Sequence, residues 1–108
     1  MAGPDLYTYL DYRRYLRDWF QARKRANPRF SHRAFVRKAK QRSPSALSDV
    51  IEGRRNLTPA NAEAFADAMA LDGEDRDFFG LLVNLDQTRD PAERNRIWTR
   101  IAATGVRN

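Results

Sequence analysis

The sequence predicts an all-α fold, a compact bundle of five or six helices. Its five prolines, at positions 4, 28, 44, 59 and 91, each stand at the start of a predicted helix or just before one, and proline at the first helical position loses no hydrogen bond. Apolar residues recur three and four positions apart in several short segments, as one face of a helix requires. No segment alternates apolar and polar residues like a half-buried strand, so we expect helices alone.

Length and composition favour a single cytoplasmic domain. A chain of 108 residues can bury a core without disulfides or a metal, so we expect one domain over residues 1–108. The chain has no cysteine, which excludes thiolate chemistry and suits a reducing cytoplasm. The first five residues lack the regions of a secretion signal, and no apolar run approaches the ~20 residues that span a bilayer. We therefore expect a soluble cytoplasmic protein with no membrane partner.

The first helix is expected over about residues 11–26. Its one side carries Tyr12, Leu16, Trp19, Phe20 and Arg23. An aromatic and basic helix can stack on bases or lie on a membrane, but large aromatic side chains in a small domain far more often form the core. We predict that this side is core.

The second helix is expected over residues 32–39. Ser31 is placed to cap its first turn, while Phe30 and Phe35 stand at the positions of a hydrophobic staple. Only about four residues, 40–43, separate this helix from the next in the predicted pattern. So short a connection predicts a sharp turn between two helices.

The third helix is expected over residues 44–52, with Ser43 as its cap, Pro44 in its first position and Gly53 as its left-handed stop. Leu47, Val50 and Ile51 form its apolar stripe. The opposite face then carries five small or acidic residues, which are Ser45, Ala46, Ser48, Asp49 and Glu52.

Three more helices complete the expected bundle. Thr58 and Pro59 start the fourth. The fifth, residues 74–88, has an acidic first turn and is apolar most of the way round, so it is either central or shared with a partner. A capping box at 90–93 opens the last helix, where Trp98 is either a core anchor or a dimer contact.

The net charge of +6 is unevenly divided. Residues 1–57 hold 14 Lys and Arg against 5 Asp and Glu, net +9, whereas residues 58–108 hold 6 against 9, net −3. A basic surface attracts polyanions because phosphate contacts release counterions. The alternative is that these arginines merely solvate helices, but this does not explain why the excess coincides with the short helices of residues 30–57.

Residues 30–71 resemble the lambda-repressor type of helix-turn-helix domain. The resemblance is carried by the cap Ser31, the turn 40–43, the helix 44–52 and the run Gly53-Arg54-Arg55-Asn56. The family usually has an Ala-Gly pair in the turn, whereas here Lys40 follows Ala39, and the turn is one residue longer. The resemblance implies a helix-turn-helix core over about 30–71, with a helical extension over about 72–103.

A second resemblance is to the N-terminal part of a family of uncharacterised bacterial regulator-like proteins. It is carried by three motifs, Asp11-Tyr12-Arg13, Ser43-Pro44-Ser45-Ala46-Leu47, and the run of residues 50–57. Together the two resemblances imply a sequence-specific DNA-binding transcriptional regulator whose partner is double-stranded DNA.

The helix-turn-helix interpretation assigns two kinds of DNA contact. Contacts to phosphates are expected from the start of helix 32–39, the turn and the cationic loop after Gly53, that is from His32, Arg33, Arg42, Arg54, Arg55 and Asn56. Contacts to base edges are expected from the outer face of the third helix, at Ser45, Ala46, Ser48 and Asp49. Since that face has no Arg, Asn or Gln, phosphate contacts are expected to dominate the affinity.

Little in the chain suggests an enzyme. His32 is the only histidine, and the five glycines are spread singly rather than in a phosphate-binding loop. We therefore expect no catalytic residues, no metal, no cofactor and no small-molecule substrate.

Two rival functions and one assembly state follow from the same residues. Asp49 and Glu52 on the third helix favour a protein-interaction module that does not bind DNA, and a helical RNA-binding domain is the other rival. Helix-turn-helix domains usually bind as two-fold dimers. A homodimer is expected through surplus apolar residues of the C-terminal half, with Phe79, Val83 and Trp98 as anchors.

Overall fold

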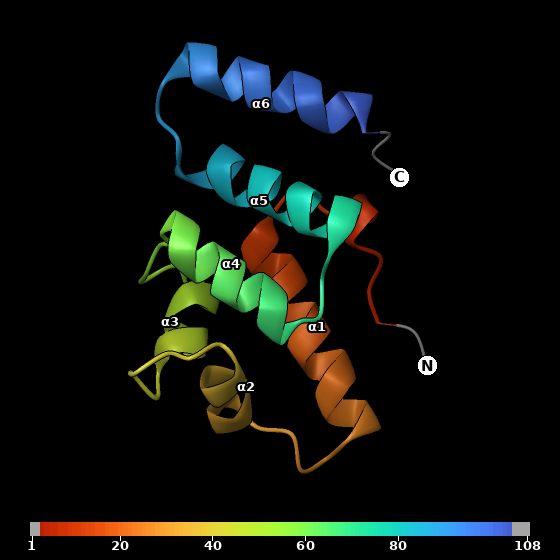
Figure 1. The fold of residues 1–108 in the computed structure, drawn as a ribbon, viewed down its shortest axis with the longest axis vertical. Helices are drawn as coiled ribbons and strands as arrows, with labels where there is room; N and C mark the ends of the chain where they lie inside the picture. The colour runs from red at the N-terminus through yellow and green to blue at the C-terminus, as the bar shows by residue number, and fades with distance from the viewer. Residues whose placement is uncertain (1–2, 105–108) are drawn as a thin grey trace.

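The computed structural model describes residues 3–104 (Figure 1). These residues form six α-helices and one short 3₁₀-helix, joined by loops, and no strand occurs in this range. The 3₁₀-helix η1 spans Leu6–Thr8. The α-helices are α1 (Tyr12–Ala26), α2 (His32–Lys38), α3 (Ala46–Ile51), α4 (Pro59–Ala68), α5 (Gly73–Gln87) and α6 (Pro91–Ala103). The predicted all-α class is confirmed. None of the described helices is both long and apolar enough to cross a membrane.

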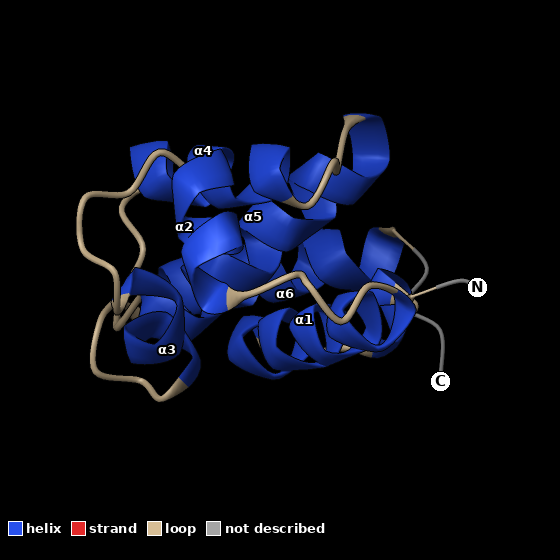
Figure 2. Ribbon diagram, turned by 90° about the horizontal axis from the view of Figure 1, so that it is seen from below, coloured by secondary structure: helices blue, strands red, loops and turns tan. Residues whose placement is uncertain are grey.

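α5 is the central helix. α6 packs on one side of it, while α4, α1 and η1 pack on the other. α2 and α3 lie at the far end of the molecule and pack on each other. Figures 1 and 2 both place α3 at an edge, flanked by loops. The helix at which the site was predicted is therefore peripheral, and the acidic C-terminal half lies mostly away from it.

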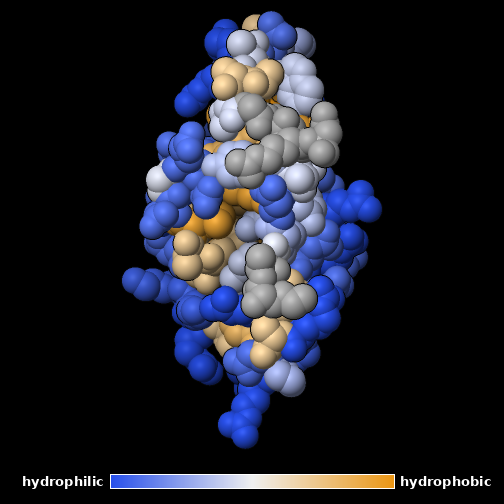
Figure 3. Space-filling view, turned by 90° about the vertical axis from the view of Figure 1, so that its right-hand side faces the viewer, coloured by the Kyte–Doolittle hydropathy of each residue, from blue (hydrophilic) through white to orange (hydrophobic). Residues whose placement is uncertain are grey.

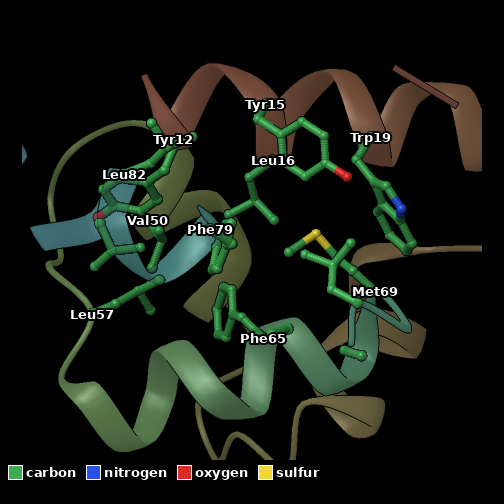
Figure 4. Close-up of a cluster of buried hydrophobic side chains, with 14 of the residues drawn as sticks. Tyr12, Tyr15, Leu16, Trp19, Val50, Leu57, Phe65, Met69, Phe79 and Leu82 are labelled. Atoms are coloured by element: carbon green, nitrogen blue, oxygen red, sulfur yellow. The ribbon is translucent and has the colours of Figure 1, made fainter. Parts of the chain in front are cut away.

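The core forms around the aromatic side of α1, as predicted. Tyr12, Leu16, Trp19 and Phe20 are buried, and the first three lie in a cluster with side chains of α3, α4 and α5 (Figure 4). The Phe20 ring packs on Phe30 and His32. Arg23, predicted on the same side, is exposed, and its guanidinium carbon lies 5.5 Å from the ring centroid of Trp19. Its cation thus covers the edge of the core and stays in water.

Phe79 and Val83 belong to this core, which corrects their assignment as dimer anchors. They are 1% and 2% exposed. The ring of Phe79 meets Tyr12 edge to face, with centroids 6.1 Å apart, and it points into the middle of the cluster in Figure 4. The apolar surplus of α5 exists because the helix is central and is covered on several sides. Of the three predicted anchors only Trp98, 47% exposed, remains on the surface.

The starts of α2, α4 and α6 follow the predicted caps, because a cap depends on its near neighbours alone. The side-chain oxygens of Ser31, Thr58 and Asp90 accept the backbone N–H groups of Ala34, Asn61 and Ala92. The capping box at 90–93 forms only in part, since Glu93 pairs with Arg96 instead. Phe30 and Phe35 both pack on Trp19, at centroid distances of 6.0 and 5.7 Å.

The third helix starts later than predicted. α3 begins at Ala46, and the Ser45 side chain makes no cap hydrogen bond. The backbone N–H of Ala46 instead bonds to the carbonyl of Ser43 at 3.1 Å, which closes a separate turn over residues 43–46. The connection between α2 and α3 is therefore residues 39–45, longer than the predicted turn 40–43.

Three helices end on a residue with positive φ: Lys40 (55°) after α2, Gly53 (81°) after α3 and Ala70 (58°) after α4. Each end has the paired backbone hydrogen bonds of a Schellman motif; after α4, for example, Ala70 N–H bonds to Asp67 and Leu71 N–H to Ala66. Lys40 thus holds the conformation that the Gly of the family's Ala-Gly pair would adopt without strain.

Ala70→Gly is expected to raise the free energy of unfolding by about 0.5–1 kcal/mol, because glycine relieves the left-handed strain of an exposed residue. Urea denaturation followed by circular dichroism measures it. The matched control is Gly53→Ala, where an added Cβ meets no atom within 4 Å, so that strain alone should lower stability by about 1 kcal/mol. If both changes altered the free energy of unfolding in the same direction and by the same amount, the assigned backbone conformations would be contradicted.

Candidate nucleic-acid interface

The segment of residues 19–48 holds nine basic residues and no Asp or Glu. We call it the basic segment; it runs from the second half of α1 through α2 and the linker 39–45 into α3. Its cations are Arg23, Lys24, Arg25, Arg29, Arg33, Arg37, Lys38, Lys40 and Arg42. Within the described residues none of them forms an ion pair.

Other residues of the basic segment engage two of these cations. Arg23 covers aromatic rings, and Lys24 Nζ donates to the carbonyls of Pro28 and Phe30. The cations of α2 and the linker, from Arg33 to Arg42, are all exposed. In the C-terminal half cations are fewer, and one of them, Arg76, is paired with both Glu63 and Asp67. Positive charge without an acidic neighbour is thus concentrated around α2 and the linker.

Two of the predicted phosphate ligands, Arg33 and Arg42, lie on this exposed surface. His32 is also exposed, and its ring packs against Phe20 with centroids 4.5 Å apart. One backbone N–H of the first turn of α2, that of Ala34, is already bonded to Ser31. The side chains of α2, more than its short N-terminus, therefore provide the positive surface.

The outer face of α3 contains fewer base-reading side chains than predicted. Ala46 is completely buried, so its assignment as a base reader is wrong. Because the helix begins at Ala46, this residue lies one turn before Val50 on the same inward stripe. Ser45 is exposed, and Ser48 and Asp49 are partly exposed. The Ser48 hydroxyl donates to the Ser45 carbonyl at 3.1 Å, which leaves its oxygen on the surface as an acceptor.

The loop 53–57 carries the other predicted phosphate ligands, Arg54, Arg55 and Asn56. Arg54 is exposed but pairs with Asp49, with Nη2 and Oδ1 3.0 Å apart. The pKa of the Asp49 carboxyl lies below its usual range. The main cause is the hydrogen bond from Ser45, and the hydrogen bond from the Arg54 guanidinium is the second cause. Arg55 makes no ion pair among the described residues. The structure thus brings Asp49 and Arg54 together, although the sequence analysis placed them in separate roles.

Arg13 holds this loop from α1, and sequence reasoning missed it. Its guanidinium donates to the carbonyls of Val50 (2.6 Å) and Arg55 (2.9 Å) and to the side-chain oxygen of Asn56 (2.7 Å). It also pairs with Asp86 of α5 at 3.2 Å, and only 15% of its side chain is exposed. The signal for it was the motif Asp11-Tyr12-Arg13 of the second resemblance. Asn56 therefore has a structural partner as well as its predicted contact.

Gln87 holds the same loop from α5. Its amide makes two hydrogen bonds to the backbone of Leu57, donating at 2.7 Å and accepting at 2.8 Å. Its oxygen also accepts the Tyr12 hydroxyl at 2.9 Å, and burial raises the pKa of Tyr12 to about 12. Loop 53–57 is therefore fixed from two helices, in the way a surface must be fixed to position charges on a ligand.

Comparisons with protein-family models, with curated proteins and with solved structures found no match to this chain. The helix-turn-helix resemblance stays a prediction.

Proposed function

We propose that this chain is a sequence-specific DNA-binding transcriptional regulator of the helix-turn-helix type. The observation that carries the proposal is the basic segment, whose exposed cations on α2 and the linker 39–45 have no carboxylate partner in the described structure. Unpaired surface cations on a short helix and its linker match what a phosphate backbone requires.

The proposed mechanism divides the contacts between two groups of side chains. Arg33, Arg42 and Arg55 bind phosphates and set the register of the protein on the duplex. The hydroxyls of Ser45, just before α3, and of Ser48 on α3 face base edges, where their oxygens can accept hydrogen bonds. Two hydroxyls read little sequence, so phosphate contacts dominate the affinity.

The double variant Arg33→Ala/Arg42→Ala is expected to lower the slope of log affinity against log salt by about two units, since each phosphate contact contributes about 0.9. Fluorescence anisotropy with a random-sequence duplex at several salt concentrations measures the slope. The matched control is Arg89→Ala/Arg100→Ala, which removes the same charge from two exposed positions in the acidic half that also lack ion pairs in the described region.

The control should leave the slope unchanged. Equal losses in the two double variants would mean that net charge alone attracts DNA and that the basic segment is not the interface. Tighter binding to single-stranded RNA of the same length would favour the RNA-binding rival.

The second candidate function is a protein-interaction module, and the observation that favours it is Trp98. This exposed ring lines a groove of about 610 Å³ between α5 and α6, together with Leu85, Pro91, Arg94 and Asn95. On the face shown in Figure 3 the hydrophobic surface is broken into patches among hydrophilic side chains. Absence of any nucleic-acid binding in the titrations above would favour this function. A homodimer remains a proposal in which Trp98 is the exposed anchor.

A further inference from the structure

Arg54 already holds an anion that belongs to the protein itself. Its Nε lies 3.1 Å and its Nη2 lies 3.0 Å from Oδ1 of Asp49. A guanidinium binds a phosphate with the same fork of donors. The second carboxylate oxygen, Oδ2, accepts the Ser45 hydroxyl at 2.9 Å. The Asp49 carboxylate therefore occupies the donors with which Arg54 would hold a phosphate.

The end of α3 places the two side chains together. The Asp49 carbonyl accepts the backbone N–H groups of Arg54 (2.8 Å) and Arg55 (3.1 Å), so the chain folds back over the last turn of the helix at Gly53. The pair is thus local and needs no ligand to form. The side chains of Arg54 and Asp49 are 61% and 25% exposed. Ion pairs in contact with water are weak, so a duplex that makes further contacts to α3 can displace this carboxylate.

We propose that Asp49 is a specificity-determining residue of the DNA-binding surface, because its carboxylate occupies Arg54 in the free protein and weakens non-specific phosphate binding. This inference rests on the proposed DNA-binding function. Affinity for random DNA comes almost wholly from phosphate contacts, and the carboxylate both removes one such contact and repels the backbone. A duplex that offers further contacts to α3 can offset the displacement, whereas a random one cannot.

The isosteric change Asp49→Asn tests this directly. We expect it to tighten binding to a random-sequence duplex about five- to tenfold at low salt and to steepen the salt slope by about one unit, since Arg54 becomes free to bind a phosphate. Glu52→Gln is the matched control. It removes the same charge from the exposed end of the same helix, and Glu52 forms no ion pair within the described residues. It should give a smaller gain with an unchanged slope.

Changes at Arg54 provide an independent check in variants whose circular dichroism shows a native fold. Arg54→Ala in the wild-type background should hardly change the slope, because that cation is already occupied. In the Asp49→Asn background the same change should reverse both the gain in affinity and the steeper slope. A full-unit fall in slope for Arg54→Ala alone would overturn the inference.

The remaining outcomes separate this inference from the proposed function. Equal gains for Asp49→Asn and Glu52→Gln with unchanged slopes would reduce the effect to general repulsion, and weaker binding of Asp49→Asn would mean that Asp49 makes a favourable contact with DNA. Either result overturns the inference and leaves the proposed function intact. The same holds if the wild type binds DNA and Asp49→Asn does not change that binding. If neither the wild type nor Asp49→Asn binds, both proposals fail.

Discussion

Phe79→Asp is expected to unfold the protein. The ring is 1% exposed and packs against the tyrosines of α1, with centroids 6.1 Å from Tyr12 and 6.4 Å from Tyr15. Removing a buried phenylalanine side chain costs about 3–5 kcal/mol, and burying a carboxylate adds to that cost. The sum approaches the whole stability of a typical domain, about 5–15 kcal/mol. Far-UV circular dichroism at about 25 °C should show loss of helix.

Two further variants make this result specific to the core. Phe79→Leu keeps an apolar side chain and should stay folded, with a loss of about 1–1.5 kcal/mol. Trp98→Asp places the same charge on a ring that is 47% exposed, where surface substitutions usually change stability by about 0.5 kcal/mol or less. A folded Phe79→Asp variant that melts near the wild-type temperature would return Phe79 to the surface and reopen its role as a dimer anchor.

Features that depend on near neighbours could be predicted from the sequence. Ser31, Thr58 and Asp90 cap their helices as expected, because the capped N–H groups lie two or three residues away. The same rule failed at Ser43, although Ser-Pro is a strong start signal. There the residues before α3 form a separate turn, in which the hydroxyls of Ser43 and Ser45 lie 3.0 Å apart. The rule recognises a place where a helix can start, but a competing local turn decides whether it does.

Features that depend on distant partners could not be predicted. The apolar circumference of α5 fitted a central helix and a dimer surface equally well, and only the packing of α1 and α4 on it decides that Phe79 is core. In the candidate site, exposure of the basic segment followed from its composition. The pairing of Asp49 with Arg54 did not, since helix periodicity says nothing about how the chain folds back after Gly53.

Arg13 shows the same limit most clearly. Its hydrogen-bond partners Val50, Asn56 and Asp86 lie 37, 43 and 73 residues away in the sequence. Its helical position suggested only a solvated cation on α1. Helix periodicity does not distinguish such an arginine from Arg14, its exposed neighbour.

Arg13→Ala is therefore expected to lower the free energy of unfolding by about 3 kcal/mol, since hydrogen bonds to a charged group contribute about 1.5–3 kcal/mol and the bonds lost at the Val50 and Arg55 carbonyls are partly buried. Without the guanidinium, the Arg55 carbonyl and the Asn56 side-chain oxygen have no other hydrogen-bond donor in the described region. Urea denaturation measures the loss. Arg14→Ala, which removes an exposed arginine without an ion pair in the same region, should cost about 0.5 kcal/mol or less.

Arg13→Lys separates the charge of Arg13 from its geometry. Lysine can keep the ion pair with Asp86, but its single ammonium cannot reach both backbone carbonyls and the Asn56 side chain in the planar fork of a guanidinium. It should therefore recover less than half of the loss in Arg13→Ala. Full recovery would show that charge alone matters at this position. If Arg13→Ala were as stable as Arg14→Ala, loop 53–57 would not need Arg13. Gln87 would then hold the loop through its two hydrogen bonds to Leu57.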